Sequence, residues 1–584
     1  MSRKTKHKKR KPVDRPISVP SWVWPTALGV LVVGTFLLRT IPSWDKIFVD
    51  GIIWFRGIDP WYHMRLADNM MANFPVPLEW DMMILYPHGM NVGYFPLMTW
   101  IITGLGQVFD YELVAVFLPP ILGALSLIPV YFICKTLWKD WVGLVACGLI
   151  MLLPSELFHR SLLGFVDHHI LEVFFLVCTL LFLVLLQQHR RVLWVVLAGV
   201  SLGLYMSSWT GGLLLVAVLW VWFVSIFMWR LKKGEPAFQF CKDMSRVFGI
   251  GLLLYLPNLA FIQGLYPSFL VFAAVAISPM LLLAMGDRLS WKRVLQGLIG
   301  CVVVACVVAQ LVIPSVFVTA RSVFVDLTST IQEVSPSTAS MLWYHYGLSF
   351  LLFIGGLIYA IKNRQNLLII MWCVFMLVLV LSQRRWSYYF IIANSILAGY
   401  CLYAILAKSR QAVRIVVCVI VCVVLVAPII PATRSISNLS PILSGDWYNA
   451  CVWLRHNTPN FDGYDELETP QAEYGVLSWW DYGNWITRIG RRTPCSNPMN
   501  QHLAIQWRVL LARGEEEANS YLDGIDYIMV DHEMVTGKLY AIYHIAPDGW
   551  PLNMETFIGM LWEDRATTWH KVHESGLVRI YARV

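Results

Sequence analysis

Repeated long apolar segments constrain the fold of this chain more than any other feature. Runs long enough to cross ~30 Å of hydrocarbon recur from about residue 24 to about residue 431. Lipid offers the backbone no hydrogen-bond partners, so such segments are expected to be helices. The 584 residues are 57% hydrophobic and 14% charged, which excludes an ordinary soluble class. We count thirteen spans, near 24–41, 113–134, 141–154, 169–187, 192–207, 210–229, 246–263, 266–284, 294–317, 344–361, 366–382, 387–406 and 413–431.

Basic residues predict the orientation of these spans. Segment 1–23 is rich in Lys and Arg, and every second loop after the first span is also basic, near residues 135, 190, 230, 288, 362 and 408. The positive-inside rule places these segments in the cytoplasm, and an odd span count then places the tail outside. The net charge of +8 comes mostly from the N-terminal segment, suits a lipid bilayer surface and gives no indication of nucleic acid.

These patterns predict three regions. A basic cytoplasmic tail covers 1–23, and a transmembrane domain covers 24–431, with large external loops at about 42–112 and 318–343. The external segment 432–584 has helical patterns near 446–456, 501–513 and 531–543 and strand patterns at 525–530 and 577–584, which predict a small α/β domain. Cys451 and Cys495 lie in this domain, and their spacing leaves open whether they pair.

Acidic residues and histidines gather in the predicted external loops. Asp59 lies in the stretch Asp-Pro-Trp-Tyr-His-Met-Arg of the first loop, and Asp167-His168-His169 opens the fourth span. The fifth external loop contains Thr330-Ile331-Gln332-Glu333. Ionisable groups at a membrane surface are costly unless they are paired or bind metal, so these positions are candidates for function.

A divalent metal site is one interpretation of these residues. Asp59, Asp167 and His169 offer two carboxylates and an imidazole, a set that suits Mg²⁺ or Mn²⁺. The alternatives are structural, because an Asp before Pro is often a turn or cap residue and a His pair beside a span is often interfacial. The span count places Arg384 and Arg385 on the external side of the membrane, where two guanidinium groups suit a phosphate. The alternative is that these arginines extend to lipid headgroups.

The external domain carries the most unusual motif, Trp479-Trp480-Asp481-Tyr482-Gly483. Two adjacent indoles followed by a carboxylate are typical of a rigid pocket for a small hydroxyl-bearing group. The alternative is a tight turn with two packed indoles.

The chain resembles the catalytic subunit of oligosaccharyltransferase, the enzyme of asparagine-linked glycosylation, in its single-subunit prokaryotic form. The four motifs occur in the order of that family: Asp59 in its first acidic motif, Asp167-x-His169 in the second, Thr330 to Glu333 as the TIxE motif, and WWDYG as the signature. Asp531-x-x-Met534-x-x-x-Lys538-x-x-x-Ile542 resembles a variant of its helical DK-type motif, and the spacings of three and four place the last three residues on one helical face.

The resemblance implies a type C membrane glycosyltransferase that transfers an oligosaccharide from a polyprenyl phosphate or diphosphate to the Asn amide of Asn-x-Ser/Thr, with inversion at the sugar. Divalent Mn²⁺ or Mg²⁺ is the implied cofactor. The implied donor-side residues are Asp59 and Glu333 for catalysis, Asp59, Asp167 and His169 for metal, and Arg384 and Arg385 for the donor phosphate. The implied acceptor-side residues are Trp479, Trp480, Asp481, Met534, Lys538 and Ile542, supported by Thr330, Tyr482 and Gly483.

Two rival functions predict different patterns. Another polyprenyl-phosphate-dependent membrane glycosyltransferase shares an acidic first loop but has no need of WWDYG or TIxE. A transporter predicts ionisable residues along a path through the spans. The resemblance implies a multi-pass protein of a prokaryotic cell membrane that acts as a single subunit, and the short tail with modest Lys and Glu content favours a bacterial over an archaeal source.

Overall fold

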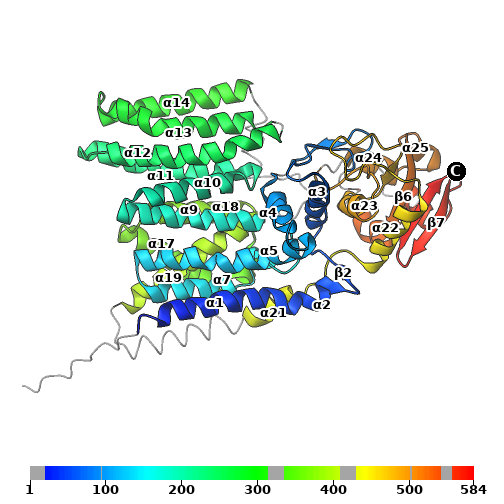
Figure 1. The fold of residues 1–584 in the computed structure, drawn as a ribbon, viewed down its shortest axis with the longest axis horizontal. Helices are drawn as coiled ribbons and strands as arrows, with labels where there is room; N and C mark the ends of the chain where they lie inside the picture. Colours follow the sequence, from blue (N-terminus) through cyan, green and yellow to red (C-terminus); the bar gives the residue numbers. More distant parts are fainter. Residues whose placement is uncertain are drawn as a thin grey trace, which may run out of the picture.

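The computed structural model has a helical bundle at one end, a C-terminal domain at the other and a helical layer between them (Figure 1). The structure describes residues 20–93, 95–262, 264–312, 335–407, 429–499, 503–540, 543 and 556–584. Three predicted site residues, Thr330, Glu333 and Ile542, therefore lie outside the described residues.

The bundle is built from helices that coincide with the predicted apolar segments. Its helices in chain order are α1 (Val23–Thr40), α5 (Tyr111–Leu125), α6 (Leu127–Leu137), α7 (Asp140–Leu152), α9 (His169–His189), α10 (Val192–Met206), α11 (Leu213–Lys233), α12 (Phe238–Tyr255), α13 (Tyr266–Gly286), α14 (Trp291–Val312), α16 (Ala339–Tyr346), α17 (Leu348–Lys362), α18 (Leu367–Ser382) and α19 (Ser387–Leu406). Helix α10 packs against α9 and α12, and α19 packs against α17 and α7. Helix α19 is therefore buried along almost its whole length in the bundle core.

The described residues contain six helices long and apolar enough to cross a membrane, or seven if α16 and α17, which bend by 94°, form one span. Helices α7, α10 and α18 are apolar but shorter. The expected span at 413–431 lies largely outside the described residues. The chain is thus a multi-pass helical membrane protein, and the count of thirteen stays a prediction.

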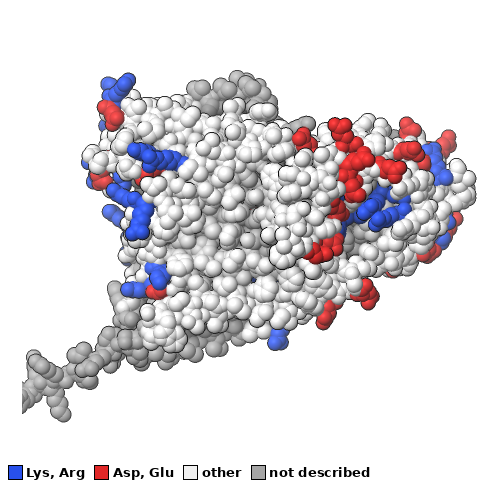
Figure 2. Space-filling view, viewed as in Figure 1, with Lys and Arg blue, Asp and Glu red and all other residues white. Residues whose placement is uncertain are grey.

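Charge separates along the long axis of the molecule. Figure 2 shows the bundle's Lys and Arg gathered at the end away from the C-terminal domain, while Asp and Glu concentrate over that domain. A belt without charge lies between them, as expected of a surface that faces lipid. This separation agrees with the predicted parity of the basic loops; which end faces the cytoplasm stays a prediction.

The layer between bundle and C-terminal domain comes from the first external loop. Its elements are α2 (Trp44–Ile47), β1 (Phe48–Val49), β2 (Ile52–Ile53), α3 (Asp59–Asn73), β3 (Trp80–Asp81), β4 (Met90–Asn91) and α4 (Leu97–Gly106). Helix α3 begins at Asp59 with Pro60 in its first turn, where the missing N–H costs no helical hydrogen bond. Most of α3 is buried because α4 covers one side and a helix of the C-terminal domain covers another.

The C-terminal domain contains helices and a four-stranded sheet, as predicted. The sheet order is β5-β6-β8-β7, with β5 parallel to β6 and the other pairs antiparallel. The strands are β5 (Gly475–Leu477), β6 (Ile525–Asp531), β7 (Trp569–Ser575) and β8 (Val578–Arg583), and the helices are α21 (Ile429–Ser437), α22 (Gly445–Asn457), α23 (Gly483–Arg488), α24 (Leu503–Leu510), α25 (Glu515–Asn519) and α27 (Phe557–Trp562).

Two details of this domain refine the predictions from sequence. The helix expected over 531–543 begins one residue later, at His532, because β6 continues through Asp531, and its Met534–Lys538 part is a π-helical turn. Cys451 and Cys495 are both buried and free, so they do not form a disulfide.

Candidate functional site

The second acidic motif lies at the external head of α9. Asp167 and His168 immediately precede the helix, and His169 is its first residue. The positive end of the helix dipole favours a carboxylate at this position. The sequence pattern thus places a carboxylate and two imidazoles at one helix end.

Asp167 is surrounded by cationic or potentially cationic groups. Its Oδ1 lies 2.8 Å from His168 Nδ1 and 3.5 Å from His63 Nε2, and its Oδ2 lies 3.6 Å from His169 Nε2 and 3.8 Å from Arg160 Nη1. Burial alone raises the pKa of the Asp167 carboxyl, but His169 and His168 outweigh it and hold the pKa well below its usual value. Asp167 is therefore an anion at neutral pH despite being buried.

The neighbouring His168 responds in the opposite direction. Burial lowers the pKa of this imidazole, but the charge of Asp167, its hydrogen bond to the ring and the charges of Glu172 and Asp59 together outweigh burial and raise the pKa above its usual value. Its Nε2 lies 3.3 Å from Glu172 Oε1, so the ring bridges two carboxylates. Sequence reasoning quoted His168 but gave it no role, because the spacing alone does not distinguish it from His169.

A cavity of about 260 Å³ opens beside this cluster and brings three of the predicted donor-side residues together. Asp59 lies on its wall with His169 and Arg385, which come from three separate segments of the chain. The lining residues are Asp59, Gly93, Phe95, Arg160, His168, His169, Ser208, Trp209, Thr210, Arg385 and Tyr388. Asp59 is half-buried, and Asp167 lies directly behind His169.

The predicted arginine pair divides between two environments. Arg385 lines the cavity, with its guanidinium 5.0 Å from the centre of the Trp386 ring. Arg384 is not among the lining residues, and its backbone N–H donates to the Ser335 carbonyl at 3.0 Å. The structure thus brings Arg385, and not Arg384, to the cavity.

Several residues of this site were missed from sequence. Arg160 lies in α8 (Glu156–Arg160), where it contacts Asp167 and lines the cavity. Tyr388 lies near the start of α19, and its hydroxyl donates to Glu172 Oε2 at 3.0 Å. One signal was available: Glu172 is an acidic residue within an apolar span, which marks a functional position in membrane proteins.

The donor atoms of this cluster fit a divalent cation. Among the described residues, the sets His63, Asp167, His168 and His168, His169, Glu172 each bring three ligand atoms within 4.8 Å of one another. The predicted set shares Asp167 and His169 with these groups, and Asp59 lines the same cavity. Carboxylate and imidazole atoms at such spacing are typical ligands of Mn²⁺, Mg²⁺ or Zn²⁺.

The WWDYG motif forms a compact turn between β5 and α23. Trp479 is buried, whereas Trp480 and Asp481 are half-buried. The Trp479 indole N–H donates to Asp481 Oδ2 at 3.1 Å, and the ammonium of Lys538 pairs with the same oxygen at 2.9 Å. The motif therefore presents one indole and a carboxylate already held by two donors.

Gly483 is required at its position by close packing. A Cβ there would lie 2.3 Å from the carbonyl oxygen of Ser496, a backbone atom that has no rotamer to escape to. Tyr482 is buried between Trp447 and Trp485, with ring centres 4.2 Å and 5.2 Å away. Both residues fix the turn that carries Trp480 and Asp481.

The DK-type segment packs beneath the motif. Met534 is fully buried, and its backbone N–H donates to Asp531 Oδ1 at 2.7 Å. Asp531 also accepts from the Trp447 indole N–H at 2.8 Å. The segment thus supports WWDYG through Asp531 and contacts it through Lys538, while the predicted contact of Met534 with an acceptor stays a prediction.

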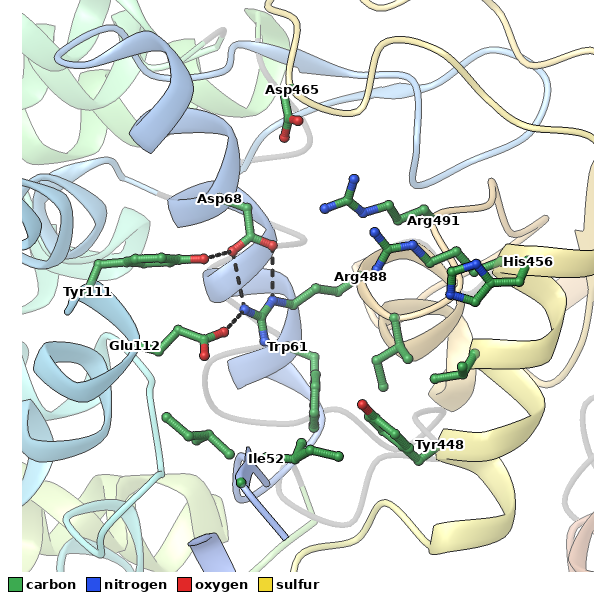
Figure 3. A pocket seen from close by; sticks show the side chains of 15 residues that line it. Ile52, Trp61, Asp68, Tyr111, Glu112, Tyr448, His456, Asp465, Arg488 and Arg491 are labelled. Carbon is green, nitrogen blue, oxygen red and sulfur yellow. Dashed lines mark hydrogen bonds and ion pairs between the residues drawn. The ribbon is translucent and has the colours of Figure 1, made fainter. Parts of the chain in front are cut away.

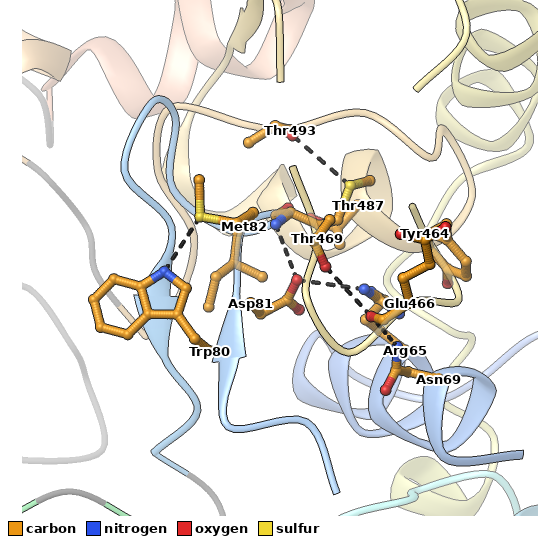
Figure 4. Close-up of polar contacts among 12 residues, drawn as sticks. Arg65, Asn69, Trp80, Asp81, Met82, Tyr464, Glu466, Thr469, Thr487 and Thr493 are labelled. Carbon is orange, nitrogen blue, oxygen red and sulfur yellow. Dashed lines mark hydrogen bonds and ion pairs between the residues drawn. The ribbon is translucent and has the colours of Figure 1, made fainter. Parts of the chain in front are cut away.

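Helix α23 connects the motif to the first external loop. Asn484, one residue after WWDYG, donates from Nδ2 to the carbonyl of Ile58 at 3.3 Å, next to Asp59. Thr487 donates to the Met83 carbonyl at 2.9 Å. Nearby, Arg65 pairs with Asp81 at 3.4 Å and Asn69 donates to the Glu466 carbonyl at 2.9 Å (Figure 4). These contacts tie the acceptor-side motif to the helix that begins with Asp59.

A buried ion network reinforces this joint. Arg488 donates from Nε to Asp68 Oδ2 at 3.1 Å and also pairs with Glu112, while Tyr111 donates to Asp68 at 2.9 Å. Figure 3 shows this network on the wall of a second cavity of about 580 Å³ between the domains. Burial alone raises the pKa of the Asp68 carboxyl, but the charge and hydrogen bonds of Arg488, with hydrogen bonds from Tyr464 and Tyr111, together outweigh it and lower the pKa below the usual value.

The chain matches two family models. The model described as oligosaccharyl transferase STT3, N-terminal, covers residues 30–325, and the model described as AglB core domain covers residues 444–535. These regions include Asp59, Asp167, His169 and the whole WWDYG motif.

Curated relatives extend the match over most of the chain. Dolichyl-phosphooligosaccharide-protein glycotransferase 3 of Archaeoglobus fulgidus is 26% identical over 90% of this chain and 71% of its own length. Glycotransferase 2 of the same archaeon is also 26% identical, over 87% of both chains. These relatives give no support to the bacterial source favoured by composition.

Solved structures show the same fold. The Archaeoglobus fulgidus enzyme AglB, in complex with an inhibitory peptide and a dolichol-phosphate, matches with a TM-score of 0.83 at 22% identity, over 95% of this chain and 80% of that chain. A structure of the Archaeoglobus fulgidus oligosaccharyltransferase with Zn and sulfate matches with a TM-score of 0.74 at 24% identity, over 90% of this chain and 70% of that chain. ArnT from Cupriavidus metallidurans shares the architecture more distantly, with a TM-score of 0.52 at 12% identity, over 97% and 99% of the two chains.

Proposed function

We propose, from the premise that this chain belongs to the oligosaccharyltransferase STT3 family and is a glycosyltransferase, that it transfers an oligosaccharide from a polyprenyl phosphate or diphosphate to the Asn amide of Asn-x-Ser/Thr. The observation that carries the proposal is the cavity beside α9. It joins Asp59, His169 and Arg385 at the end of the bundle that faces the WWDYG domain. A single-subunit enzyme at the external face of a prokaryotic membrane fits this arrangement.

The donor phosphate is proposed to bind in this cavity. Arg385 and Arg160 supply guanidinium groups on its wall, and the imidazole of His168, whose pKa is raised above its usual value, lines the same wall. Guanidinium groups bind phosphate oxygens with paired N–H donors, and their charge stabilises the negative charge that grows on the departing phosphate. The dolichol-phosphate named for the AglB complex supports a polyprenyl donor of this kind.

A divalent Mn²⁺ or Mg²⁺ is proposed to be held by Asp59, Asp167 and His169. When bound, the metal supplies positive charge against the leaving phosphate oxygens. The structure of the Archaeoglobus fulgidus oligosaccharyltransferase in complex with Zn and sulfate supports metal binding by a protein of this fold but does not choose between Mn²⁺ and Mg²⁺. Asp167 is already deprotonated at neutral pH, because the His residues around it lower its pKa, and so it is ready to ligate.

The acceptor amide needs activation because its nitrogen lone pair is delocalised into the carbonyl. We propose that Asp59 and Glu333 each accept one N–H of the Asn side chain. Two such acceptors favour rotation about the C–N bond, whose full barrier is ~18–20 kcal/mol, and so free the lone pair. Attack by this nitrogen from the side opposite the phosphate then forms the N–C1 bond as the C1–O bond to the phosphate breaks. The sugar carbon is inverted, the polyprenyl phosphate or diphosphate leaves with the bonding electron pair, and one amide proton passes to an accepting carboxylate.

Recognition of the acceptor hydroxyl is assigned to the WWDYG turn. The indole N–H of Trp480 is buried and has no hydrogen-bond partner within the described part of the chain, so it is available to a Ser or Thr hydroxyl. Asp481 offers the matching acceptor, and Trp479 and Lys538 hold it in place. A site with such polar groups rejects a residue without a hydroxyl, because its own groups then stay unpaired. Met534 or Ile542 is proposed to contact the Thr methyl.

The test uses the purified full chain in detergent with polyprenyl-linked oligosaccharide and a fluorescent peptide. We expect transfer to Asn-x-Thr, no transfer to matched Gln-x-Thr, and strong loss with Asn-x-Ala. Chelation should abolish transfer, and added Mn²⁺ or Mg²⁺ should restore it. Equal labelling of the Asn and Gln peptides, or no transfer from monophosphate and diphosphate donors alike, contradicts the proposal.

A further inference from the structure

A buried carboxylate that the mechanism does not use lies directly beneath the metal-binding candidates. Glu172 belongs to the first turn of α9 and is fully buried. A carboxylate at this depth costs several kcal/mol unless donors surround it. Its Oε1 faces His169 Nδ1 at 3.0 Å and His168 Nε2 at 3.3 Å.

The two sides of the His169 ring face different carboxylates. Nδ1 lies 3.0 Å from Glu172 Oε1, and Nε2 lies 3.6 Å from Asp167 Oδ2. A neutral imidazole has one N–H and one lone pair, and a carboxylate only accepts. The shorter contact assigns the N–H to Nδ1, which leaves the lone pair of Nε2 on the side of Asp167 and available to a cation.

The second oxygen of Glu172 connects to another part of the site. Tyr388 donates to Oε2 at 3.0 Å, and Tyr389 makes a short hydrogen bond to the same atom. Both tyrosines lie in the first turn of α19, immediately after the segment that carries Arg385. Glu172 therefore joins the metal ligand on α9 to the helix that presents the phosphate-binding arginine.

We propose that Glu172 is a positioning residue that fixes His169 in the tautomer whose Nε2 binds the divalent cation and holds the start of α19 beside it. The inference rests on the proposed metal site and deepens it. The rival role, Glu172 as a ligand itself, fits less well because both oxygens already accept hydrogen bonds. One cation also cannot use both nitrogens of the same ring, and Glu172 faces Nδ1.

The experiment measures Mn²⁺ binding to the purified full chain by electron paramagnetic resonance, without any transfer reaction. Glu172→Gln keeps the shape but no longer offers a charged acceptor, so we expect Mn²⁺ affinity to fall about 10–100-fold. The nitrogen modulation of the bound Mn²⁺ signal should weaken as His169 loses its fixed tautomer. Glu515→Gln is the matched control, since Glu515 accepts hydrogen bonds from Thr567 and Thr568 in the C-terminal domain. Its Mn²⁺ affinity should equal that of the wild type.

The outcomes separate this inference from the proposed function. If the wild type binds Mn²⁺ and Glu172→Gln binds it with an affinity within twofold of the wild type, the role of Glu172 is overturned and the proposed metal site stands. Absence of Mn²⁺ binding by the wild type overturns both. Tyr389→Phe removes one hydrogen bond to Glu172 but leaves the contact between Glu172 and His169 in place. This variant should therefore retain Mn²⁺ affinity within about threefold. A loss as large as that of Glu172→Gln contradicts the assignment to His169. Gel filtration and melting curves identify any variant that fails to fold.

Discussion

The donor and acceptor halves of the candidate site differ in how firmly their own contacts hold them. On the donor side, the Asp167 side chain is 3% exposed and faces two guanidinium or imidazole groups on each oxygen. On the acceptor side, the Asp481 side chain is 20% exposed, and two donors share one of its oxygens. The carboxylate proposed to bind the metal is thus held at a helix end of the bundle. The carboxylate proposed to bind the acceptor hydroxyl lies on a more accessible turn.

This difference predicts separable kinetics. Preorganised charges act mainly on the transition state, so their loss should lower kcat. Accessible recognition groups act on bound peptide, so their loss should raise the KM for peptide. The joint through Arg488 and Asp68 should affect neither directly but should stabilise the contact between the two halves.

The largest effect is expected for Asp59→Asn. This change removes a negative charge from the cavity while keeping the shape, and we expect kcat to fall about 10³-fold with peptide KM nearly unchanged. Steady-state transfer to the fluorescent peptide measures both. Asp50→Asn on the same external loop is the control, because Asp50 is exposed in the β1–β2 turn. A kcat for Asp59→Asn within tenfold of the control would contradict a catalytic role for Asp59.

The next effect is on stability at the joint. Asp68→Asn leaves Arg488 with one of its two carboxylates, and we expect the free energy of unfolding at pH 7 to fall by about 3 kcal/mol. Because folding lowers the pKa of Asp68, its contribution is present above the usual pKa of about 3.9 and is lost as pH falls through the lowered pKa. Unfolding free energies of the two proteins should therefore converge as the pH falls through this lowered pKa, and a difference that stays constant down to the acid limit argues against this network.

Arg385→Ala sharpens the donor side. Loss of the cavity guanidinium should lower kcat/KM for the lipid-linked donor about 10²-fold, with peptide KM unchanged. Arg384→Ala is the matched control in the adjacent position and should lose less than threefold, because Arg384 is not among the cavity residues. Equal losses in both variants would indicate a general charge effect at the membrane surface.

The smallest effect is expected for Lys538→Met. Without its ammonium partner, Asp481 should hold the hydroxyl less well, so peptide KM should rise about tenfold while kcat stays within twofold. Lys571→Met on strand β7 serves as control, since Lys571 pairs with Asp564 and Glu574 on that domain's surface. A fall in kcat without a change in KM would place Lys538 among the charge-handling groups.

The sequence predicted most of the helices because lipid imposes one solution on a long apolar run. The patterns near 446–456 and 577–584 likewise matched α22 and β8. The count of spans could not be read as safely, since α7, α10 and α18 are short and α16 bends sharply into α17. Hydropathy reports length and composition, and it carries little information about bends.

The residues of the candidate site could be predicted where they belong to a recognisable sequence motif. Asp59, His169 and Arg385 reach one cavity although about 110 and 215 residues separate them along the chain. Arg160 and Tyr388 were missed because their partners, Asp167 and Glu172, lie in other segments of the chain, and no local spacing records such contacts. Glu172 was missed although its contacts to His168 and His169 span only four and three residues. The assignment of Arg384 also shows this limit, since adjacent arginines necessarily point in different directions from a short turn.

The position of the donor phosphate tests the account most directly. A structure of the full chain in detergent with a polyprenyl phosphate and Mn²⁺ should show the phosphate between Arg385 and the Asp167–His169 pair, with the polyprenyl chain leaving toward the bundle surface. A phosphate in the larger cavity beside Arg488, or anywhere away from Arg385 and His169, would contradict it.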